Sequence, residues 1–553
     1  MKNILYILLI MGIILTSCSD EFLEKNPYGE LTEEESAQPQ NIDGLIISAY
    51  SILNGQGNEA SNAFNSPASN WSFGDVLSDD AYKGGGGTGD QNQIHRMEIY
   101  TTNPQIKDVD QKWSVLYEGV KRSNTVISVL NNSTDIDENT KALRISEMRF
   151  LRGHFYFELK KLYNRISYID ETGAYFSNTT ISPEEIWGKI ESDFNAAFAT
   201  LPSTQEDPGR PTKWAAKAYL CKTYLYQQKW QQANDAADEV IANGGYNLMP
   251  NFNEIFLPEN DNGSEVVFAI QYSINDGSPR NYNGSIGDRL MPPGGPRYPG
   301  YGFLRPSQNL VNSYKTDASG FPILDNVDIT PTDNVDPRLD VTVGRPGIPY
   351  KDLEITYEAD WARDLATYGP YGPKKRVISA NHPDYLASWP YVTAANYYII
   401  RYADVLLWKA EAAIELSELE TGRTHINMVR NRAKTGVYTQ DLVGTSDASN
   451  YMIDTYNSAF TTKDEAIIAL RTERRLEMAH EGHRFFDLVR WGIAADVINT
   501  YLTKEKLERG YLTGATFVAG KHEYMPIPQT QIDAKANDAD GNLLPASTQN
   551  PGY

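Results

Sequence analysis

The spacing of apolar and polar positions predicts helices over long parts of the chain. Between 144 and 163, apolar residues recur every three or four positions, and 400–414 shows the same spacing. This spacing places one apolar face along an α-helix. Weaker forms of the pattern favour helix pairs at 110–165, at 397–434 and at 463–500.

The segment 211–245 shows the clearest paired-helix pattern. Pro211 and Thr212 are typical of a helix start, and a short polar break divides the apolar pattern that follows into two helices. The spacing resembles a tetratricopeptide repeat, with Cys221 and Ala233 where paired helices approach closely. We therefore expect Cys221 to be a packing residue. Repeats of this kind stack into a solenoid with one continuous core, so the fold class is mostly α.

Long segments of a different character lie between the helical patterns. Residues 60–93, 273–305 and 345–395 are dense in Gly, Pro and aromatic residues and show little periodicity. Non-helical insertions of this length are usually functional. We expect them to form a large irregular lobe, with short β elements, that packs over one side of the helical scaffold.

The N-terminal residues are typical of export. An apolar run of 12 residues, Ile4 to Leu15, follows a positive start. It is shorter than the roughly 20 residues that span a bilayer, and it fits the core of a signal peptide over 1–17. The residues up to Cys18 resemble a bacterial lipobox. This predicts acylation of Cys18 and a lipid-anchored, extended segment over 18–40.

Composition narrows the classes of function. The chain has 50 Lys+Arg against 72 Asp+Glu, a formal net charge of −22, which argues against binding nucleic acid or anionic lipid head groups. Tyrosine is abundant at 35 residues, against 18 Phe and 9 Trp, and tyrosine suits wet surfaces. Two cysteines cannot make a disulfide framework.

Several segments together resemble the SusD/RagB family of nutrient-binding outer-membrane lipoproteins. Their order and their spread over the whole chain carry the resemblance. They are the lipobox followed by 20–27 (DEFLEKNP), 401–412 (RYADVLLWKAEA), 471–492 (RTERRLEMAHEGHRFFDLVRWG), 524–533 (YMPIPQTQID) and the ending 549–553 (QNPGY).

The resemblance implies a fold, a location and a partner. It implies four tetratricopeptide-like helix pairs in one domain over 41–553, with the scaffold at about 41–250 and 396–553. The expected lobe at about 251–395 matches the family's sequences only loosely, and members of the family bind their ligands in this region. The acidic residues after Cys18 resemble a surface-export signal, so the protein would be lipid-anchored at the cell surface. The implied partner is a SusC-like TonB-dependent outer-membrane transporter, and the implied ligand is a glycan or sometimes a peptide.

Ligand binding would depend on aromatic rings in the loops. A flat ring covers the apolar face of a sugar, while carboxylates, amides and arginines bind its hydroxyl groups. Trp71 and Tyr82 rank first, because the Gly and Asp residues around them suggest few core neighbours. The full set of candidates is Trp71, Asp79, Asp80, Tyr82, Tyr298, Tyr301, Arg305, Trp361, Tyr371 and Trp389.

Catalytic and metal motifs are weak. The cluster from His480 to His483 is not HExxH and lies in a run rich in Arg and Glu, so we expect a structural network with Arg474 buried among carboxylates. A glycosidase needs two convergent carboxylates, for which Asp79 and Asp80 offer weak evidence. We find no GxSxG, Walker or Rossmann motif and predict a binding protein without cofactor or metal. Peptide cargo, a surface glycoside hydrolase and a protein-binding scaffold remain the alternatives.

Overall fold

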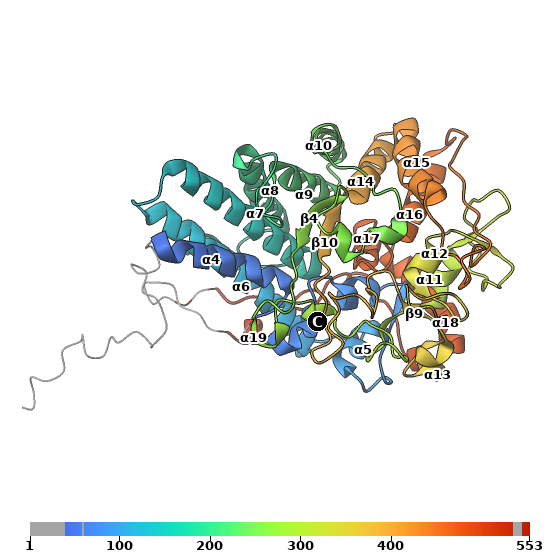
Figure 1. Cartoon of the computed structure of the whole chain (residues 1–553). Coiled ribbons are helices and arrows are strands. Elements are labelled where there is room, and N and C mark those ends of the chain that lie inside the picture. The colour runs from blue at the N-terminus through green and yellow to red at the C-terminus, as the bar shows by residue number, and fades with distance from the viewer. Residues whose placement is uncertain (1–38, 58–59, 535–542, 544) are drawn as a thin grey trace, which may run out of the picture.

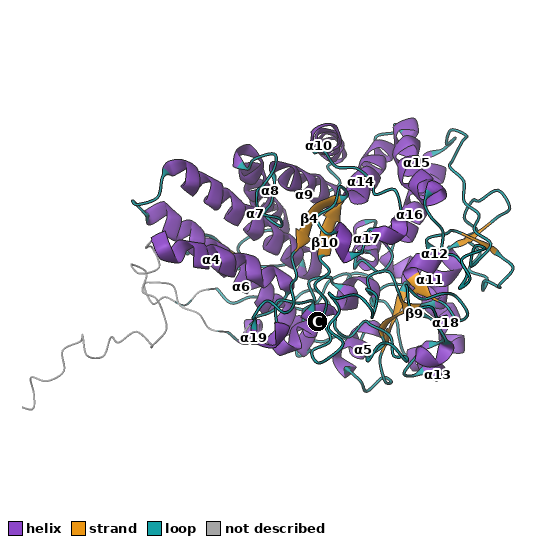
Figure 2. Ribbon diagram, in the orientation of Figure 1, coloured by secondary structure: helices purple, strands orange, loops and turns teal. Residues whose placement is uncertain are grey.

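The computed structural model describes residues 39–57, 60–534, 543 and 545–553. Helices dominate, and the strands form short two-stranded ladders, which confirms the mostly α-helical fold class (Figures 1 and 2). The signal peptide over 1–17 and the acylation of Cys18 lie outside the described residues and stay predictions. Within the described ranges, no helix has the length and apolar character needed to cross a membrane.

The scaffold is a row of helices in which each packs on the next. In the order α6, α7, α8, α9, α10, α14, α15 and α16, each helix contacts the one before it and the one after it. Helix α4 packs on α6 and α7 at the start of the row. Figure 1 shows this row as a curved layer along one side of the molecule. The helices are α4 (Pro39–Ser51), α6 (Lys107–Asn132), α7 (Glu138–Tyr163), α8 (Pro183–Thr200), α9 (Lys213–Tyr226), α10 (Trp230–Asn243), α14 (Tyr402–Glu415), α15 (Leu419–Thr435) and α16 (Lys463–Met478).

The predicted pair over 211–245 is confirmed as α9 and α10. The Thr212 side chain caps α9 by accepting a hydrogen bond from the backbone N–H of Ala215. Cys221 is fully buried, and its Sγ lies 3.3 Å from the carbonyl oxygen of Ala233 on α10. Its role in packing is therefore confirmed.

Helix α8 was not predicted, although the sequence contains its start signal. Ser182 and Glu185 form a capping box in which each side chain bonds the backbone N–H of the other residue, and Pro183 occupies the first helical position. This signal fixes where α8 begins between α7 and α9.

Close helix packing predicts a large effect of one glycine substitution. A Cβ at Gly119 on α6 would lie 2.5 Å from the ring of Phe155 on α7. We expect Gly119→Ala to lower the free energy of unfolding by about 1–3 kcal/mol, because the ring has to move within a packed core. Urea denaturation measures the change. Gly188→Ala on α8 is the matched control: no atom lies within 4 Å of its added Cβ, so it should be neutral or stabilising. Equal effects of the two changes would refute the packing argument.

The irregular lobe consists of short elements joined by long loops (Figure 2). Its helices, with those that follow α16, are α5 (Asn92–Glu98), α11 (Gln308–Ser313), α12 (Leu339–Thr342), α13 (Leu365–Tyr368), α17 (Arg484–Arg490), α18 (Ala494–Glu508) and α19 (Gln529–Asp533). The antiparallel ladders pair β1 (Ala81–Gly84) with β5 (Phe303–Pro306), β2 (Tyr168–Ile169) with β3 (Tyr175–Phe176), β4 (Val266–Ile270) with β10 (Tyr397–Arg401), β6 (Lys315–Thr316) with β7 (Asn334–Val335), and β8 (Val343–Gly344) with β9 (Gly372–Pro373).

Two of these ladders join the lobe to the scaffold. Strand β10 continues directly into α14, so the β4–β10 ladder is anchored in the helix row. The β1–β5 ladder pairs Tyr82 with Arg305, which brings the loop at 60–93 into the lobe.

A buried charge network reinforces the junction between scaffold and lobe. Its connected ion pairs balance five carboxylates with five cations, and every member is buried. The carboxylates come from the lobe, α16 and the turn after it, and the cations from the lobe, β10 and α15. The members are Glu265, Asp336, Glu473, Glu477, Glu481, Arg338, Lys375, Arg401, Arg430 and Arg432.

Candidate functional site

Trp71 and Tyr82 lie in the main core rather than in an open groove. Trp71 is 0% exposed, its Nε1 donates to the carbonyl oxygen of Gly287 at 3.0 Å, and its ring meets the edge of Phe303. Tyr82 is 1% exposed and donates to Glu505 at 2.6 Å. The expectation of few core neighbours is corrected: Trp71 packs against Gly287 and Phe303, and Gly84 and Gly85 let the loop approach 302–305 closely. In this structure neither ring offers a face to a ligand.

Asp79 and Asp80 bind arginines of the C-terminal helices. Arg484 Nε lies 2.8 Å from Asp79, and Arg475 Nε lies 2.7 Å from Asp80. Burial disfavours ionisation of both carboxyls, but the two arginines outweigh it at Asp79 and lower its pKa, whereas the pKa of Asp80 is raised. Both side chains are buried, so they do not form the open carboxylate pair of a glycosidase.

Most of the remaining candidates are core residues of the lobe. Arg305 is buried and donates to Tyr357 Oη at 3.1 Å. Tyr298 donates to the carbonyl oxygen of Ile378 at 2.9 Å. Trp361 is 3% exposed, and Tyr371 is half-buried. These positions hold the lobe together and leave little ring surface for a ligand.

Tyr301 and Trp389 differ, because neither is buried and the Tyr301 ring meets a ring on the segment that carries Trp389. Trp389 is 48% exposed and Tyr301 is half-buried. The Tyr301 ring meets the Tyr391 ring at 5.9 Å, and Tyr391 is two residues from Trp389. Arg280 lies over the Trp389 ring at 5.7 Å and donates to Tyr282 Oη at 3.2 Å.

Arg289 completes this set, which we call the aromatic patch. Tyr282 and Tyr301 lie near enough to Arg289 to act on its pKa, which burial lowers. Arg289 and Tyr391 also line the same small pocket, so the segments at 280–301 and 389–391 meet here. The aromatic patch consists of Arg280, Tyr282, Arg289, Tyr301, Trp389 and Tyr391.

Sequence reasoning missed four members of the patch, Arg280, Tyr282, Arg289 and Tyr391. A signal existed for three of them: an Arg and a Tyr stand two positions apart in RNY at 280–282, and WPY at 389–391 places two rings together, whereas no local pattern marks Arg289. What the sequence did not show is that these segments, about a hundred residues apart, meet in space.

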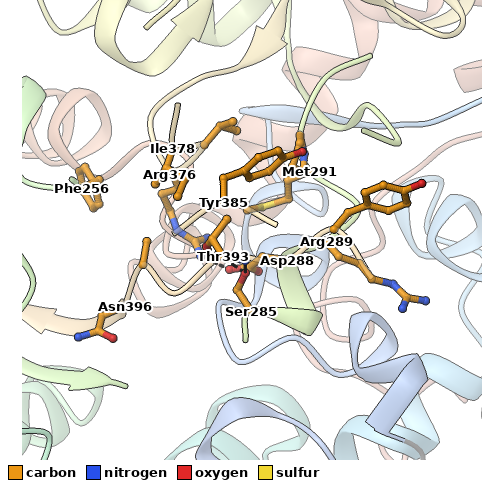
Figure 3. Close-up of a pocket in the computed structure, with 14 residues that line it drawn as sticks. Phe256, Ser285, Asp288, Arg289, Met291, Arg376, Ile378, Tyr385, Thr393 and Asn396 are labelled. Carbon is orange, nitrogen blue, oxygen red and sulfur yellow. Dashed lines mark hydrogen bonds and ion pairs between the residues drawn. The ribbon is translucent and has the colours of Figure 1, made fainter. Parts of the chain in front are cut away.

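A small polar pocket adjoins the aromatic patch (Figure 3). Its cavity of about 30 Å³ is large enough for water but too small for a sugar ring. Asp288 at its centre is bound by Arg376 and by the Ser69 hydroxyl. Figure 3 shows Arg289 extending away from this ion pair, toward the outside of the pocket. Other lining residues include Ser285, Tyr385, Tyr391, Thr393 and Asn396.

A larger hollow of about 1180 Å³ follows the outer side of α6. Its rings are Trp113, Tyr117 and Tyr175, but Trp113 is 4% exposed. Ala534 and Pro545, close to the C-terminus, form part of its wall. The aromatic patch is the better candidate, because its rings are more open and alternate with arginines.

The His480–His483 cluster is a buried structural network, as expected. Arg474 is held by Asp404 at 3.1 Å and Asp487 at 2.6 Å, so its predicted burial among carboxylates is confirmed. Glu481 pairs with Arg401 and Lys375. Burial lowers the pKa of His480 to about 3 and that of His483 to about 4, so both rings are neutral near pH 7. Among the described residues, no cluster of His, Cys, Asp and Glu could hold a metal ion.

His480 should contribute to acid sensitivity. Its folded pKa of about 3 lies below the unfolded value near 6.5, so only the unfolded chain takes up this proton between those values. The contribution of His480 to the free energy of unfolding is therefore present in full above pH 6.5. It decreases as the pH drops toward 3, by up to about 1.4 kcal/mol per pH unit. Asparagine accepts the positive φ of 64° at position 480, so the His480→Asn variant keeps the backbone conformation and removes the titrating ring. Urea denaturation at pH 7, 6 and 5 should give a shallower dependence for the variant, and parallel curves would contradict this assignment.

Comparisons with known proteins agree on one family. Residues 264–553 match a family model described as the SusD family, and residues 21–225 match one described as starch-binding associating with outer membrane. A SusD-like protein of Formosa agariphila is 24% identical, with 100% of this chain and 99% of that protein covered.

Solved structures share the fold. A laminarin-binding SusD-like protein has a TM-score of 0.68 at 24% identity, covering 93% of this chain and 100% of that one. Surface glycan-binding protein A from Bacteroides thetaiotaomicron, in complex with laminarihexaose, also has a TM-score of 0.68, at 21% identity over 93% of this chain and 99% of that one. Because the first family model alone covers more than half of the sequence, the chain belongs to the SusD family.

Proposed function

We propose that this protein captures a glycan at the cell surface on the aromatic patch. The observation that carries the proposal is the patch itself, in which the exposed Trp389 ring and three half-buried tyrosine rings lie near two guanidinium groups of the lobe. Rings stack on the apolar faces of sugars, and guanidinium donors bind sugar oxygens. The laminarin-binding and laminarihexaose-bound structures, and the family described as starch-binding, support a glycan as the ligand.

We further propose that capture involves no bond cleavage. Hydrolysis of a glycosidic bond needs two carboxylates about 5–10 Å apart across the substrate. Among the described residues that line the pocket, Asp288 alone has a carboxylate, and Arg376 and Ser69 bind it. This arrangement supports binding rather than hydrolysis.

The proposal extends to an anchor and a partner. Acylation of Cys18 would hold the protein on the outer membrane, and a SusC-like TonB-dependent transporter would receive the glycan. The match to a family described as associating with outer membrane supports this location. A lipid-anchored protein that binds but does not cleave needs a second protein to import what it holds.

A binding screen with product analysis tests the proposal. The soluble chain, starting after Cys18, is titrated with laminarin, starch, charged polysaccharides and peptides, and each mixture is then analysed for cleavage. We expect binding of at least one glycan with its chain length unchanged. Peptide binding alone would favour peptide cargo. Shortened glycan would favour a hydrolase, and binding of neither class would contradict capture.

A further inference from the structure

The aromatic patch concentrates positive charge in an acidic protein. The chain has a net charge of −22, and buried arginines such as Arg401 and Arg474 are bound by carboxylates. The two arginines of the patch contact rings instead: Arg280 lies over Trp389, and Arg289 lies 4.8 Å from the ring centre of Phe64. Neither has a carboxylate at ion-pair distance in the described part of the chain.

Arg289 is the less satisfied of the two. Its Nε and Nη1 atoms are buried and have no hydrogen-bond acceptor among the described residues. Tyr282 and Tyr301 lie beside it, but a neutral hydroxyl does not balance its charge, and an arginine does not lose that charge near pH 7. A partly desolvated guanidinium without a counterion is unfavourable, and an approaching anion relieves that cost.

Arg280 is the second guanidinium of the patch. It is exposed and fixed by its hydrogen bond to Tyr282 and by the Trp389 ring. A sugar that contacts the Trp389 ring therefore lies close to the Arg280 guanidinium. At physiological salt, charges farther away than about 8 Å are screened, so the net charge of the whole chain does not determine the potential beside these two arginines.

We propose that the glycan captured on this patch carries an oxyanion, either a uronate carboxylate or a sulfate ester, and that Arg289 and Arg280 bind it. The inference depends on the proposed capture function and narrows its ligand class. Both oxyanions present two oxygens to the fork of N–H donors on the exposed guanidinium of Arg280, a geometry that a neutral hydroxyl cannot match, and Arg289 adds a positive charge without a counterion.

Matched pairs of glycans test this inference at 0.15 M salt by isothermal titration calorimetry. One pair is oligogalacturonate and its methyl ester, and the other is a sulfated dextran oligosaccharide and plain dextran. We expect the charged member of at least one pair to bind about tenfold or more tightly than its neutral partner. Arg289→Gln and Arg280→Gln should each weaken binding of the charged glycan about tenfold, and by a larger factor than they weaken binding of its neutral partner. Circular dichroism checks that both variants fold.

Arg165→Gln is the matched control. Arg165 is an exposed arginine after α7, also without an ion pair to a described residue, and its change should leave binding unaltered. Equal affinity for both members of each pair, or a preference for charge that survives the double arginine variant, overturns the inference while leaving glycan capture in place. Binding of none of these glycans, nor of laminarin or starch, overturns both.

Discussion

Replacing Arg401 with methionine is expected to lower the free energy of unfolding by about 3–5 kcal/mol. Arg401 lies at the end of β10, is fully buried, and bonds Glu265 at 2.7 Å, Glu477 at 2.6 Å and Glu481 at 2.8 Å. Methionine fills a similar volume but leaves the buried charge network with one uncompensated negative charge. The loss is large because water cannot reach these carboxylates.

Urea denaturation of the wild type and the variant measures this effect. Arg165→Met, at an exposed arginine, should stay within about 0.5 kcal/mol of the wild type. A loss below about 1 kcal/mol for Arg401→Met would show that the remaining arginines rebalance the network. Because the network joins α16 to the lobe, the variant should also bind glycan less tightly if the junction loosens.

Replacing Trp389 with alanine is expected to weaken glycan binding at least tenfold, about 1.4 kcal/mol or more. Trp389 has the most exposed ring of the patch at 48%, and truncating a central aromatic anchor commonly has effects of this size. Stability should change little, because half of the side chain is already in water. Calorimetric titration with the glycan found in the screen measures the affinity.

Trp214→Ala on α9 is the matched control for this prediction. Trp214 is a half-buried tryptophan of the helical scaffold, packed against Phe198, and it lies outside the patch. Its loss should leave affinity unchanged even if it lowers stability. A Trp389→Ala protein that binds as tightly as the wild type would remove Trp389 from the site.

The fold was predictable where local spacing determines it. Helices α9 and α10 followed from apolar periodicity, and the burial of Arg474 followed from its place on an apolar stripe. Helix α8 was missed because its capping signal is only four residues long.

The site was less predictable, because tertiary partners decide which polar and aromatic groups stay open. The carboxylate of Asp79 is bound by Arg484, some four hundred residues away, and the indole N–H of Trp71 by Gly287. Neither of these two binding partners can be inferred from the composition of the loop. Tyr301 and Trp389 were named from composition, but their neighbours in the patch depend on how 280–301 meets 389–391.

A crystal structure of the protein with a bound oligosaccharide from the screen tests the central claim most directly. The account predicts a sugar ring against Trp389 and Tyr391, with a charged or polar substituent facing Arg289. An oligosaccharide bound elsewhere, such as in the hollow along α6, with the aromatic patch empty, would contradict it.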